Sequence, residues 1–527
     1  MRSFHLPGRS PVYARNAMCA TSHPLASLAA IECLKSGGNA VDAAITAVAV
    51  LCVVEHPMTG IGGDCFAMLA KPGEKPIALN SSGFAPKAAT AAWYAKEGMA
   101  TIPVQSPHAV TVPGAIDGWT RLLKDHGTRS IGDCLAPAIA LARGGFPVAP
   151  RVATDWGRAL AKIKANPGMA AHFLKDGRTP RAGEVMKLPA LARTLEAIAK
   201  EGRDGFYAGE VAADMVAELK ALGGLHTLDD FAAQTGSYVE PIAVDYRGTA
   251  LHELPPNLHG IVALIMLKMM ARMGAPPAGP ASAERYHLLM EAARLAYAMR
   301  DAFVADPATA AVPVDHMLSD RVIADLVERI DPARKTDLGS VPQPAGSDTV
   351  YLAIVDKAGL AVSFINSLFA DFGSGIATRK TGVVFHNRAT GFVLDPKHPN
   401  CIAPRKRPMH TLIPALATRG GKPVFAFGVM GAAFQPMGHV YMMSNMVDYG
   451  MDPQEALDCP RVFFEGEHLL IEEGVPPATA QRLAMMGHSV RMRDLPWGGG
   501  QIIAMGGADG VLIGASDHRK DGLALGY

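Results

Sequence analysis

The sequence has no marked excess of one charge and no long hydrophobic run. Its 527 residues include 50 Lys and Arg against 49 Asp and Glu. It has no basic stripe with interleaved aromatic residues, so nucleic acid is not an expected partner. The longest apolar run, Ala43 to Val54, lies between Asp42 and Glu55, and it is too short for a membrane span, which needs about 20 residues. It indicates a buried helix, and no membrane is expected as a partner.

Signals for export, disulfides and metals are also scarce. The N-terminus has no apolar signal core, which favours a cytoplasmic location. The seven cysteines are scattered, odd in number and without a C-x-x-C pair, which is typical of free, buried thiols in a reducing compartment. Neither zinc spacing of His and Cys nor an H-E-x-x-H motif occurs, and "TGIGGDCFAMLA" matches no phosphate-binding loop. The sequence therefore predicts no metal and no cofactor.

What the chain does have is apolar material for a substantial core, at 49% hydrophobic residues. Residues 23–56 predict two helices separated at Gly37-Gly38, and residues 281–307 predict a long helix with His287 on one face. From Asp348 onward strands dominate, with predicted strands at 349–355, 360–368, 382–387, 423–430, 468–474, 489–494, 501–507 and 510–517. Helices followed by strands favour a layered α/β class. The expected linker is Leu338 to Ser347, rich in Pro, Gly and Ser.

One predicted hairpin carries the first chemical signal. The turn Lys357-Ala358-Gly359 suits a three-residue loop with glycine in its left-handed position. Pairing outward from this turn places Thr349 opposite Ser367, within a residue or so if a bulge shifts the ladder. Facing residues have Cβ atoms about 4.5–5.5 Å apart, so the two hydroxyls could hydrogen-bond.

Two interpretations of this pair are open. It is either a cross-strand contact that stabilises a sheet or a nucleophile with its partner. A threonine hydroxyl needs a base, and cutting the preceding peptide bond would free an α-amino group that titrates near 8. Downstream, "FGVMGAAF" places Gly431 and Ala432 after a strand, where small residues allow backbone N–H groups to approach a substrate oxygen as in an oxyanion hole.

At this point the motifs resemble those of the γ-glutamyltranspeptidase superfamily of N-terminal nucleophile hydrolases. The resemblance spans nearly the whole chain, in order, through "GGNAVDAAITAVAV", "GIGGDCF", "VPGAIDGW", "DTVYLAIVDKAGLAVSFINSLFADFGSGI", "APRKRP", "GVMGAAF" and "LIGASDHRKDGLALGY". It implies a four-layer αββα fold and self-cleavage of the Asp348–Thr349 bond. A large chain of residues 1–348 and a small chain of residues 349–527 would then remain associated in one body.

The resemblance also implies roles for individual residues. Thr349 matches the nucleophile, and Ser367 matches a second hydroxyl residue, usually threonine, that hydrogen-bonds to it. Gly431 and Ala432 match a Gly-Gly oxyanion pair. The acyl group of an amide substrate would pass to Thr349 as an ester and then to water or an amine.

Four substrate-recognition positions depart from the family pattern. Ser82 stands where the arginine for the substrate α-carboxylate is expected, and Gly391 where the aspartate for the α-amino group is expected. Phe369 replaces an asparagine, and His410-Thr411 replaces a Ser-Ser pair. A site without this cation and this anion has no ready partners for a zwitterionic amino acid, which argues against γ-glutamyl compounds as preferred substrates.

"SFINSLFxxFGSGI" with "MHTLIPA" looks closest to the oxamate amidohydrolase branch, which splits the amide of a small oxoacid. Asn366 and His410 are then candidate contacts for a small anionic acyl group, or else a strand-face amide and a structural histidine. Arg405 or Arg407 would supply charge if either points inward. The alternative functions are a γ-glutamyltransferase or glutathione hydrolase and a non-catalytic family member. The oligomeric state is open, with a homodimer among the options.

Overall fold

The computed structural model describes residues 8–337 and 348–527. The predicted linker, Leu338 to Ser347, lies outside the described residues. Two sheets of seven strands each form the centre of the described part, and every pair of neighbouring strands in them is antiparallel. The first sheet has the order β1 (Val12–Ala14), β18 (Leu512–Ser516), β17 (Gly500–Ala504), β13 (Lys422–Val429), β12 (Ala415–Arg419), β9 (Thr249–Glu253) and β8 (Ile242–Tyr246). The second has the order β19 (Leu523–Gly526), β2 (Met18–Thr21), β10 (Asp348–Val355), β11 (Ala361–Phe369), β3 (Asp64–Ala70), β4 (Ile77–Ser81) and β7 (Ser237–Val239).

The two sheets pack face to face through an apolar core. Tyr351 and Ile365 of the second sheet belong to the same buried cluster as Leu416, Ala426 and Ile503 of the first. Successive side chains of a strand point to opposite faces, so each sheet has a second apolar face that must be covered. Helices provide that cover.

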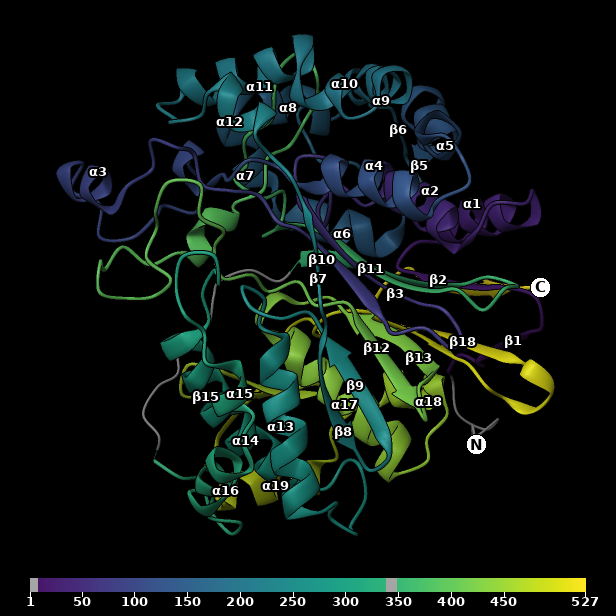
Figure 1. Cartoon of the computed structure of the whole chain (residues 1–527), viewed down its shortest axis with the longest axis vertical. Coiled ribbons are helices and arrows are strands. Elements are labelled where there is room, and N and C mark those ends of the chain that lie inside the picture. Colours follow the sequence, from purple (N-terminus) through teal and green to yellow (C-terminus); the bar gives the residue numbers. More distant parts are fainter. Residues whose placement is uncertain (1–7, 338–347) are drawn as a thin grey trace.

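Helices on either side of the sheet pair belong to separate apolar clusters (Figure 1). The cluster on the second sheet draws mainly on helices from the first half of the chain, which are α1 (Pro24–Lys35), α2 (Ala40–Val54), α4 (Ala115–His126), α5 (Ile131–Gly144), α6 (Pro150–Arg158), α7 (Leu160–Ala165), α8 (Pro167–Phe173), α9 (Pro189–Glu201), α10 (Asp204–Tyr207), α11 (Gly209–Ala221) and α12 (Leu228–Ala232). The cluster on the first sheet draws on α13 (Gly260–Met273), α14 (Ala283–Phe303), α15 (Val314–Met317), α16 (Asp320–Glu328), α17 (Gln435–Asp448), α18 (Pro453–Asp458) and α19 (Pro477–Met485).

Smaller elements complete the described chain. The short α3 (Ala91–Lys96) lies at the edge of the molecule in Figure 1 and contributes Tyr94 to a separate small apolar cluster. The remaining elements are a three-stranded sheet of β14 (Val462–Glu465), β15 (His468–Ile471) and β16 (Ser489–Met492), the pair β5 (Phe146–Pro147) and β6 (Val185–Met186), and the 3-10 turns η1 (Pro107–Ala109), η2 (Arg388–Gly391), η3 (Ala432–Phe434) and η4 (Ala508–Gly510).

The break between the first two helices is confirmed. Helix α1 ends at Lys35, and Gly37 then takes a positive φ of 96°, which glycine adopts without steric cost. Asn39 starts α2 by accepting hydrogen bonds from the amides of Val41 and Asp42, while the Asp42 carboxylate accepts from the Asn39 amide. All residues of α2 are buried, as predicted for the apolar run.

The picture of a helical body and a strand-rich tail needs three corrections. Strands β7, β8 and β9 lie in the middle of the chain, where helices were expected to dominate. The tail contains α17, of which Gln435–Met446 is buried, so its sequence lacks the alternation of polar and apolar faces that predicts a helix. Residues 382–387 form isolated bridges to Gly62 and Ala377 and no strand.

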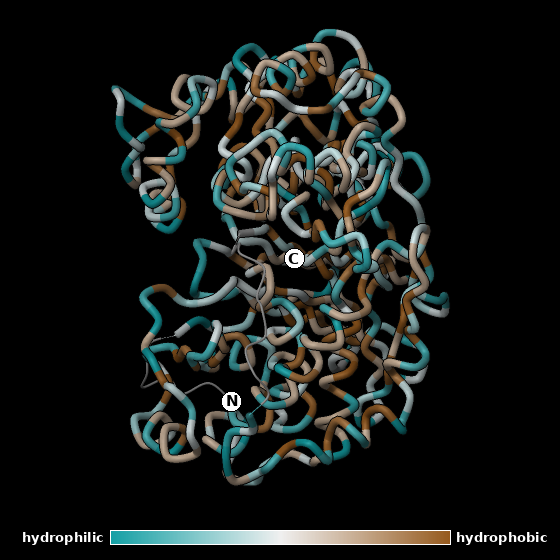
Figure 2. The backbone as a smooth tube through the Cα atoms, turned by 90° about the vertical axis from the view of Figure 1, so that its left-hand side faces the viewer, coloured by the Kyte–Doolittle hydropathy of each residue, from teal (hydrophilic) through white to brown (hydrophobic). Residues whose placement is uncertain are grey.

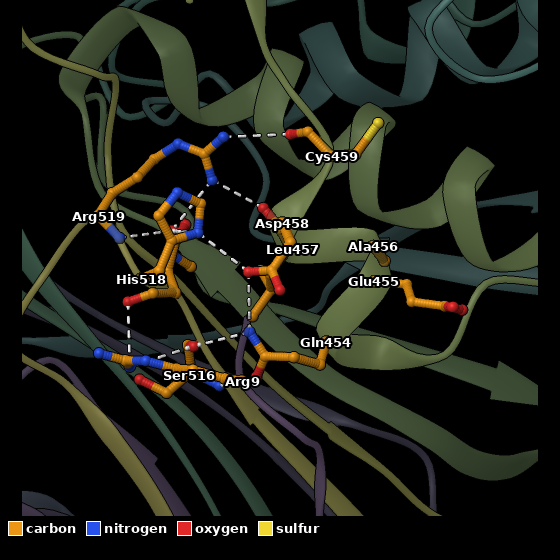
Figure 3. A network of polar contacts seen from close by, with 12 residues as sticks. Arg9, Gln454, Glu455, Ala456, Leu457, Asp458, Cys459, Ser516, His518 and Arg519 are labelled. Atoms are coloured by element: carbon orange, nitrogen blue, oxygen red, sulfur yellow. Dashed lines mark hydrogen bonds and ion pairs between the residues drawn. The ribbon is translucent and has the colours of Figure 1, made fainter. Parts of the chain in front are cut away.

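Both sheets contain strands from before and after residue 348. In the second sheet β10 lies between β2 and β11, and β11 in turn pairs with β3. Figure 3 shows a further link, in which Arg9 donates to the Ser516 carbonyl of the last segment. Arg9 also donates to the Gly522 carbonyl. In the same network Arg519 donates to the carbonyl of Cys459 and the His518 ring meets Asp458. The two segments therefore share one core.

The interior is apolar and its thiols are free. Figure 2 shows hydrophilic stretches mostly along the outline and hydrophobic stretches mostly inside. All seven cysteines are free, and five of them, Cys19, Cys33, Cys52, Cys65 and Cys134, are buried. Among the described residues no helix combines the length and apolar character that crossing a bilayer requires.

Candidate active site

The predicted hairpin is present with its predicted pairing. Val350 pairs with Asn366 and Tyr351 with Ile365, while a register shift lies between Asp348 and Val350. At that shift the Thr349 hydroxyl donates a hydrogen bond of 3.1 Å to the Ser367 hydroxyl. Both residues are buried. A bulge at the start of β10 therefore aims Thr349 at Ser367, as bulges commonly do beside functional sites.

Neighbouring residues of β11 point to opposite faces of its sheet. Ser367 has the same parity as Ile365, which lies in the core between the sheets. Asn366 points the other way, where its amide donates to Thr59 and Gly60 and accepts from Trp119. The structure therefore does not bring the Asn366 side chain to the Thr349 hydroxyl, and the amide is fully engaged in structural contacts.

Asp64 is the buried anion of this region. It begins β3 directly opposite Ser367, and one of its oxygens accepts hydrogen bonds of 3.0 Å from the amides of Gly83 and Gly114. The other oxygen accepts from His410 Nε2 at 3.0 Å. Burial alone would raise the pKa of Asp64, but its His386 and His410 partners outweigh burial and hold that pKa well below its usual range. Asp64 is an anion at neutral pH.

His410 is committed to this anion and is not a free substrate contact. Its Nδ1 accepts a hydrogen bond from the Leu412 amide, so Nε2 carries the proton that it donates to Asp64. Burial lowers the pKa of His410 to about 3, which keeps the ring neutral. The neighbouring Thr411 hydroxyl accepts a hydrogen bond from Arg388.

Arg388 is the residue of this region that sequence reasoning missed. Its guanidinium is buried, lies 4.0 Å from the centre of the Phe369 ring and donates one hydrogen bond, of 2.9 Å, to the Thr411 hydroxyl. Its Nε and Nη2 atoms are buried and have no hydrogen-bond partner among the described residues. Burial lowers the pKa of Arg388 to about 9, so it is still charged at neutral pH. The signal in the sequence was a lone arginine in "HNRATGF", three positions before Gly391.

The two arginines predicted as sources of charge have other contacts. Arg405 is exposed. Arg407 stacks on the Phe84 ring at 4.5 Å and donates to the Thr235 carbonyl and the Ser237 hydroxyl. Of these arginines, Arg388 is the one that contacts Phe369, whose amide donates to Ser367.

The other predicted contacts lie around this group. Phe369 has a positive φ of 80°, and its amide donates to the Ser367 hydroxyl. The Ser82 hydroxyl is buried and donates to the Asn80 side chain. At Gly391 a Cβ atom would lie 2.6 Å from the Met409 carbonyl oxygen, so the backbone here has no room for the aspartate of the family pattern.

The predicted oxyanion residues form a tight turn. Gly431 precedes η3 with φ 122°, and Ala432 follows with φ 45°, a conformation that is uncommon for a residue with a Cβ. The first amides of a helical turn have no acceptor within it. Gly428, just upstream, is in tight contact with the Tyr351 ring, which places the end of β13 near the start of β10. Gly431 also lines a cavity of about 60 Å³.

One group outside this region has the composition of a metal site. His287, Glu291 and His488 place their ligand atoms within 4.8 Å of one another. Each already has protein partners: the two rings share a hydrogen bond of 2.8 Å, His287 also meets the Asp331 carbonyl, and Glu291 accepts from the Thr336 amide. The group is complete as a structural polar cluster and leaves none of these atoms unpartnered.

Comparison with known proteins identifies the family. The model of the gamma-glutamyltranspeptidase family matches residues 26–527. The chain belongs to this family. It is 37% identical over 519 residues to the glutathione hydrolase-like YwrD proenzyme of Bacillus subtilis, covering 97% of this chain and 98% of the relative. It is 35% identical over 526 residues to the oxamate amidohydrolase proenzyme of Klebsiella pneumoniae, again covering 97% and 98%.

A solved structure shares the whole fold. The crystal structure of cephalosporin acylase from Bacillus halodurans superposes with a TM-score of 0.93 at 38% identity, covering 100% of this chain and 99% of that one. The predicted family resemblance is thus confirmed. The relatives carry different substrate names, so membership of the family fixes a hydrolase and proenzyme context but no particular substrate.

Proposed function

We propose that this protein is a self-processing amidohydrolase or acyltransferase with Thr349 as an N-terminal nucleophile in a four-layer αββα fold. Cleavage of the Asp348–Thr349 bond would give a large chain of residues 1–348 and a small chain of residues 349–527. The observation that carries the proposal is the 3.1 Å hydrogen bond from the Thr349 hydroxyl to Ser367 at a bulge in the first residues of β10. Because the two segments share both sheets, the cut chains would stay together.

Self-cleavage would begin with attack of the Thr349 hydroxyl oxygen on the Asp348 carbonyl carbon. The peptide C–N bond breaks as an ester forms, the Thr349 nitrogen takes up the proton, and water then hydrolyses the ester. The products are the Asp348 carboxylate and a free α-amino group on Thr349. That amine, with an ordinary pKa near 8, becomes the base that the hydroxyl lacked.

Turnover would reuse the same atoms. The Thr349 amine accepts the hydroxyl proton as the oxygen attacks the substrate amide, and the N–H groups of Gly431 and Ala432 stabilise the oxyanion. The proton passes to the leaving amine, and the acyl group stays on Thr349 as an ester. Water or an amine then takes the acyl group, and the hydroxyl is restored. Ser367 orients the attacking oxygen throughout.

The proposed substrate is a small acidic amide such as oxamate. A buried guanidinium with two unpaired donors supports an anionic acyl group, because an unpaired buried charge is costly. A γ-glutamyl compound, the alternative, also carries an ammonium group. Asp64 cannot serve that group, because its oxygens already accept from Gly83, Gly114 and His410, and Gly391 has no carboxylate.

Thr349→Ala is the direct test. The variant should remain one chain of 55.4 kDa and be inactive, whereas the wild type should run as two bands of roughly 36 and 19 kDa, in proportion to the chain lengths. Activity would be measured on oxamate, a γ-glutamyl anilide, and glutaryl and N-acyl amides. A cut or active Thr349→Ala protein would contradict the mechanism. A wild type that stays uncut would favour the non-catalytic alternative.

A further inference from the structure

We propose that Arg388 binds a carboxylate of the substrate acyl group, so that the preferred substrates are monoamides of dicarboxylic acids without an α-amino group. The inference rests on the proposed function and names its specificity residue. Arg388 belongs to the small chain. It is neither one of the substrate contacts predicted from the sequence nor one of the positions that depart from the family pattern.

The first observation is the unmet bonding capacity of the guanidinium. Arg388 is 1% exposed, and a guanidinium has five N–H donors. Among the described residues only Thr411 accepts a hydrogen bond from it, while Nε and Nη2 have none. Buried charges are otherwise paired and hydrogen-bonded. Nε and one Nη atom form the fork that binds a carboxylate in two parallel hydrogen bonds.

The second observation is that the guanidinium is fixed in place. Its plane lies over the Phe369 ring at 4.0 Å, and Thr411 holds Nη1. The preceding residue, Asn387, donates its amide to the Leu368 carbonyl and accepts from the Ala370 amide. Such a preorganised cation loses little conformational entropy when an anion binds.

The third observation is the position of this cation relative to the nucleophile. Phe369 pairs with Asp348 across the ladder and donates its amide to Ser367, which accepts from Thr349. Arg388 is thus linked to the reacting hydroxyl through Phe369 and Ser367. A carboxylate held by Arg388 would place a nearby amide carbonyl next to Thr349, as a short dicarboxylic monoamide requires.

The cluster also discriminates against an ammonium group. The charged and titratable groups that contact its segments include Asp64, His386, His410 and His259, whose ring meets the Thr411 carbonyl. Burial lowers the pKa of His410 to about 3 and holds the pKa of His259 well below its usual range, so both rings are neutral. The Asp64 oxygens are occupied by amides and His410. A carboxylate therefore finds two free donors here, whereas an α-ammonium group finds no free anion among these residues.

The test compares a carboxylate with its neutral counterpart. Matured wild type, Arg388→Gln, Arg388→Lys and Arg407→Gln would be assayed on oxamate and oxamide, and on succinamate and succinamide. Arg407 is the matched control, because it also lies over a phenylalanine ring but both its Nη atoms donate, to Ser237 and Thr235, so that among the described residues only its Nε has no partner. Arg388→Gln should lower kcat/KM for the monoamides about 10²-fold. It should change kcat/KM for the diamides by less than about threefold.

Arg388→Lys should recover part of the loss, since it restores charge without the fork, and Arg407→Gln should match wild type. Equal losses on monoamides and diamides, or an unchanged preference in Arg388→Gln, would overturn the inference. Calorimetric binding of oxalate to wild type and Arg388→Gln gives a readout that does not need turnover. If Arg388→Gln fails to mature, oxalate binding can be compared between uncut Thr349→Ala with and without Arg388→Gln. Equal affinity of the two proteins for oxalate would again overturn the inference.

The two proposals can fail separately. A wild type that stays uncut and hydrolyses no amide refutes the proposed function. A wild type that is cut and active but hydrolyses oxamide as well as oxamate leaves the nucleophile in place and refutes only the role of Arg388.

Discussion

The Thr349–Ser367 hairpin and the Arg388 cluster lie side by side but are built in opposite ways. The hairpin is one continuous segment whose turn fixes the pairing of its two strands. The cluster joins Arg388 and Phe369 to Thr411 and, through His410, to Asp64, which begins a strand far earlier in the chain. The first is local geometry, and the second exists only once the sheets have assembled.

This difference explains what each region can do. A hairpin supplies a precise distance between two hydroxyls, because cross-strand spacing is nearly constant. A cluster drawn from several segments can bury a charge and shield it from water, which strengthens its interaction with an anion. We therefore assign the reacting atoms to the hairpin and substrate selection to the cluster.

The largest effect is expected from a substitution in the Thr349–Ser367 hairpin. Ser367→Ala removes the acceptor of the Thr349 hydroxyl and should slow self-cleavage and turnover by about 10²–10⁴-fold, the range for losing a group that assists proton transfer. Asn366→Ala is the matched control, because it lies on the opposite face of the same strand and should lower the melting temperature without a comparable loss of kcat. Rates would be followed by gel densitometry and amide hydrolysis. Equal effects of the two substitutions would make Ser367 merely structural.

The next largest effect is expected from removing the buried anion of the Arg388 cluster. Asp64→Asn replaces an anion that accepts from Gly83, Gly114 and His410, and it should destabilise the fold by about 3–5 kcal/mol, as breaking a buried charged pair does. Melting temperatures would be compared in the Thr349→Ala background, where a single chain is expected. A melting temperature equal to that of the background would show that Asp64 does not anchor the cluster.

A smaller effect is expected from restoring the aspartate of the family pattern at position 391. Gly391→Asp restores the expected aspartate, but its Cβ would lie 2.6 Å from the Met409 carbonyl oxygen, so overpacking should cost about 1–3 kcal/mol. Gly391→Ala tests the steric part alone and should lower the melting temperature similarly. A stable Gly391→Asp protein that gains γ-glutamyl hydrolysis would contradict this account of the pocket.

The smallest effect concerns a buried carboxyl outside both regions. Burial raises the pKa of Glu55 to about 8 against the pull of Lys520. The pKa of Glu55 in the folded protein lies above its ordinary value. The contribution of Glu55 to the free energy of unfolding is therefore fully present below about pH 4.5 and is lost as the pH rises through about 8. Glu55→Gln keeps an acceptor for the Ser22 hydroxyl and should have a higher melting temperature than wild type at pH 9, because it cannot ionise. An identical pH dependence in both proteins would refute the shift.

The contrast also shows how far the sequence could be followed. Turn chemistry and pairing outward from the turn predicted the hairpin and the Thr349–Ser367 contact, and the Gly37-Gly38 pair predicted the break between α1 and α2. Helix α17 was missed because a buried helix has no polar face to set its period. Arg388 was missed because nothing local distinguishes a buried arginine from an exposed one. The "RKR" run drew attention instead, although Arg405 is exposed and Arg407 has other partners.

The central claim is that Thr349 becomes a chain terminus and uses its own amine as base. N-terminal sequencing of purified, active protein, with intact masses of both chains, tests it most directly. The account predicts one chain that begins at Thr349 with T-V-Y-L-A and a second that ends at Asp348. Active protein that remains a single chain, or that is cut at any other bond, would contradict it.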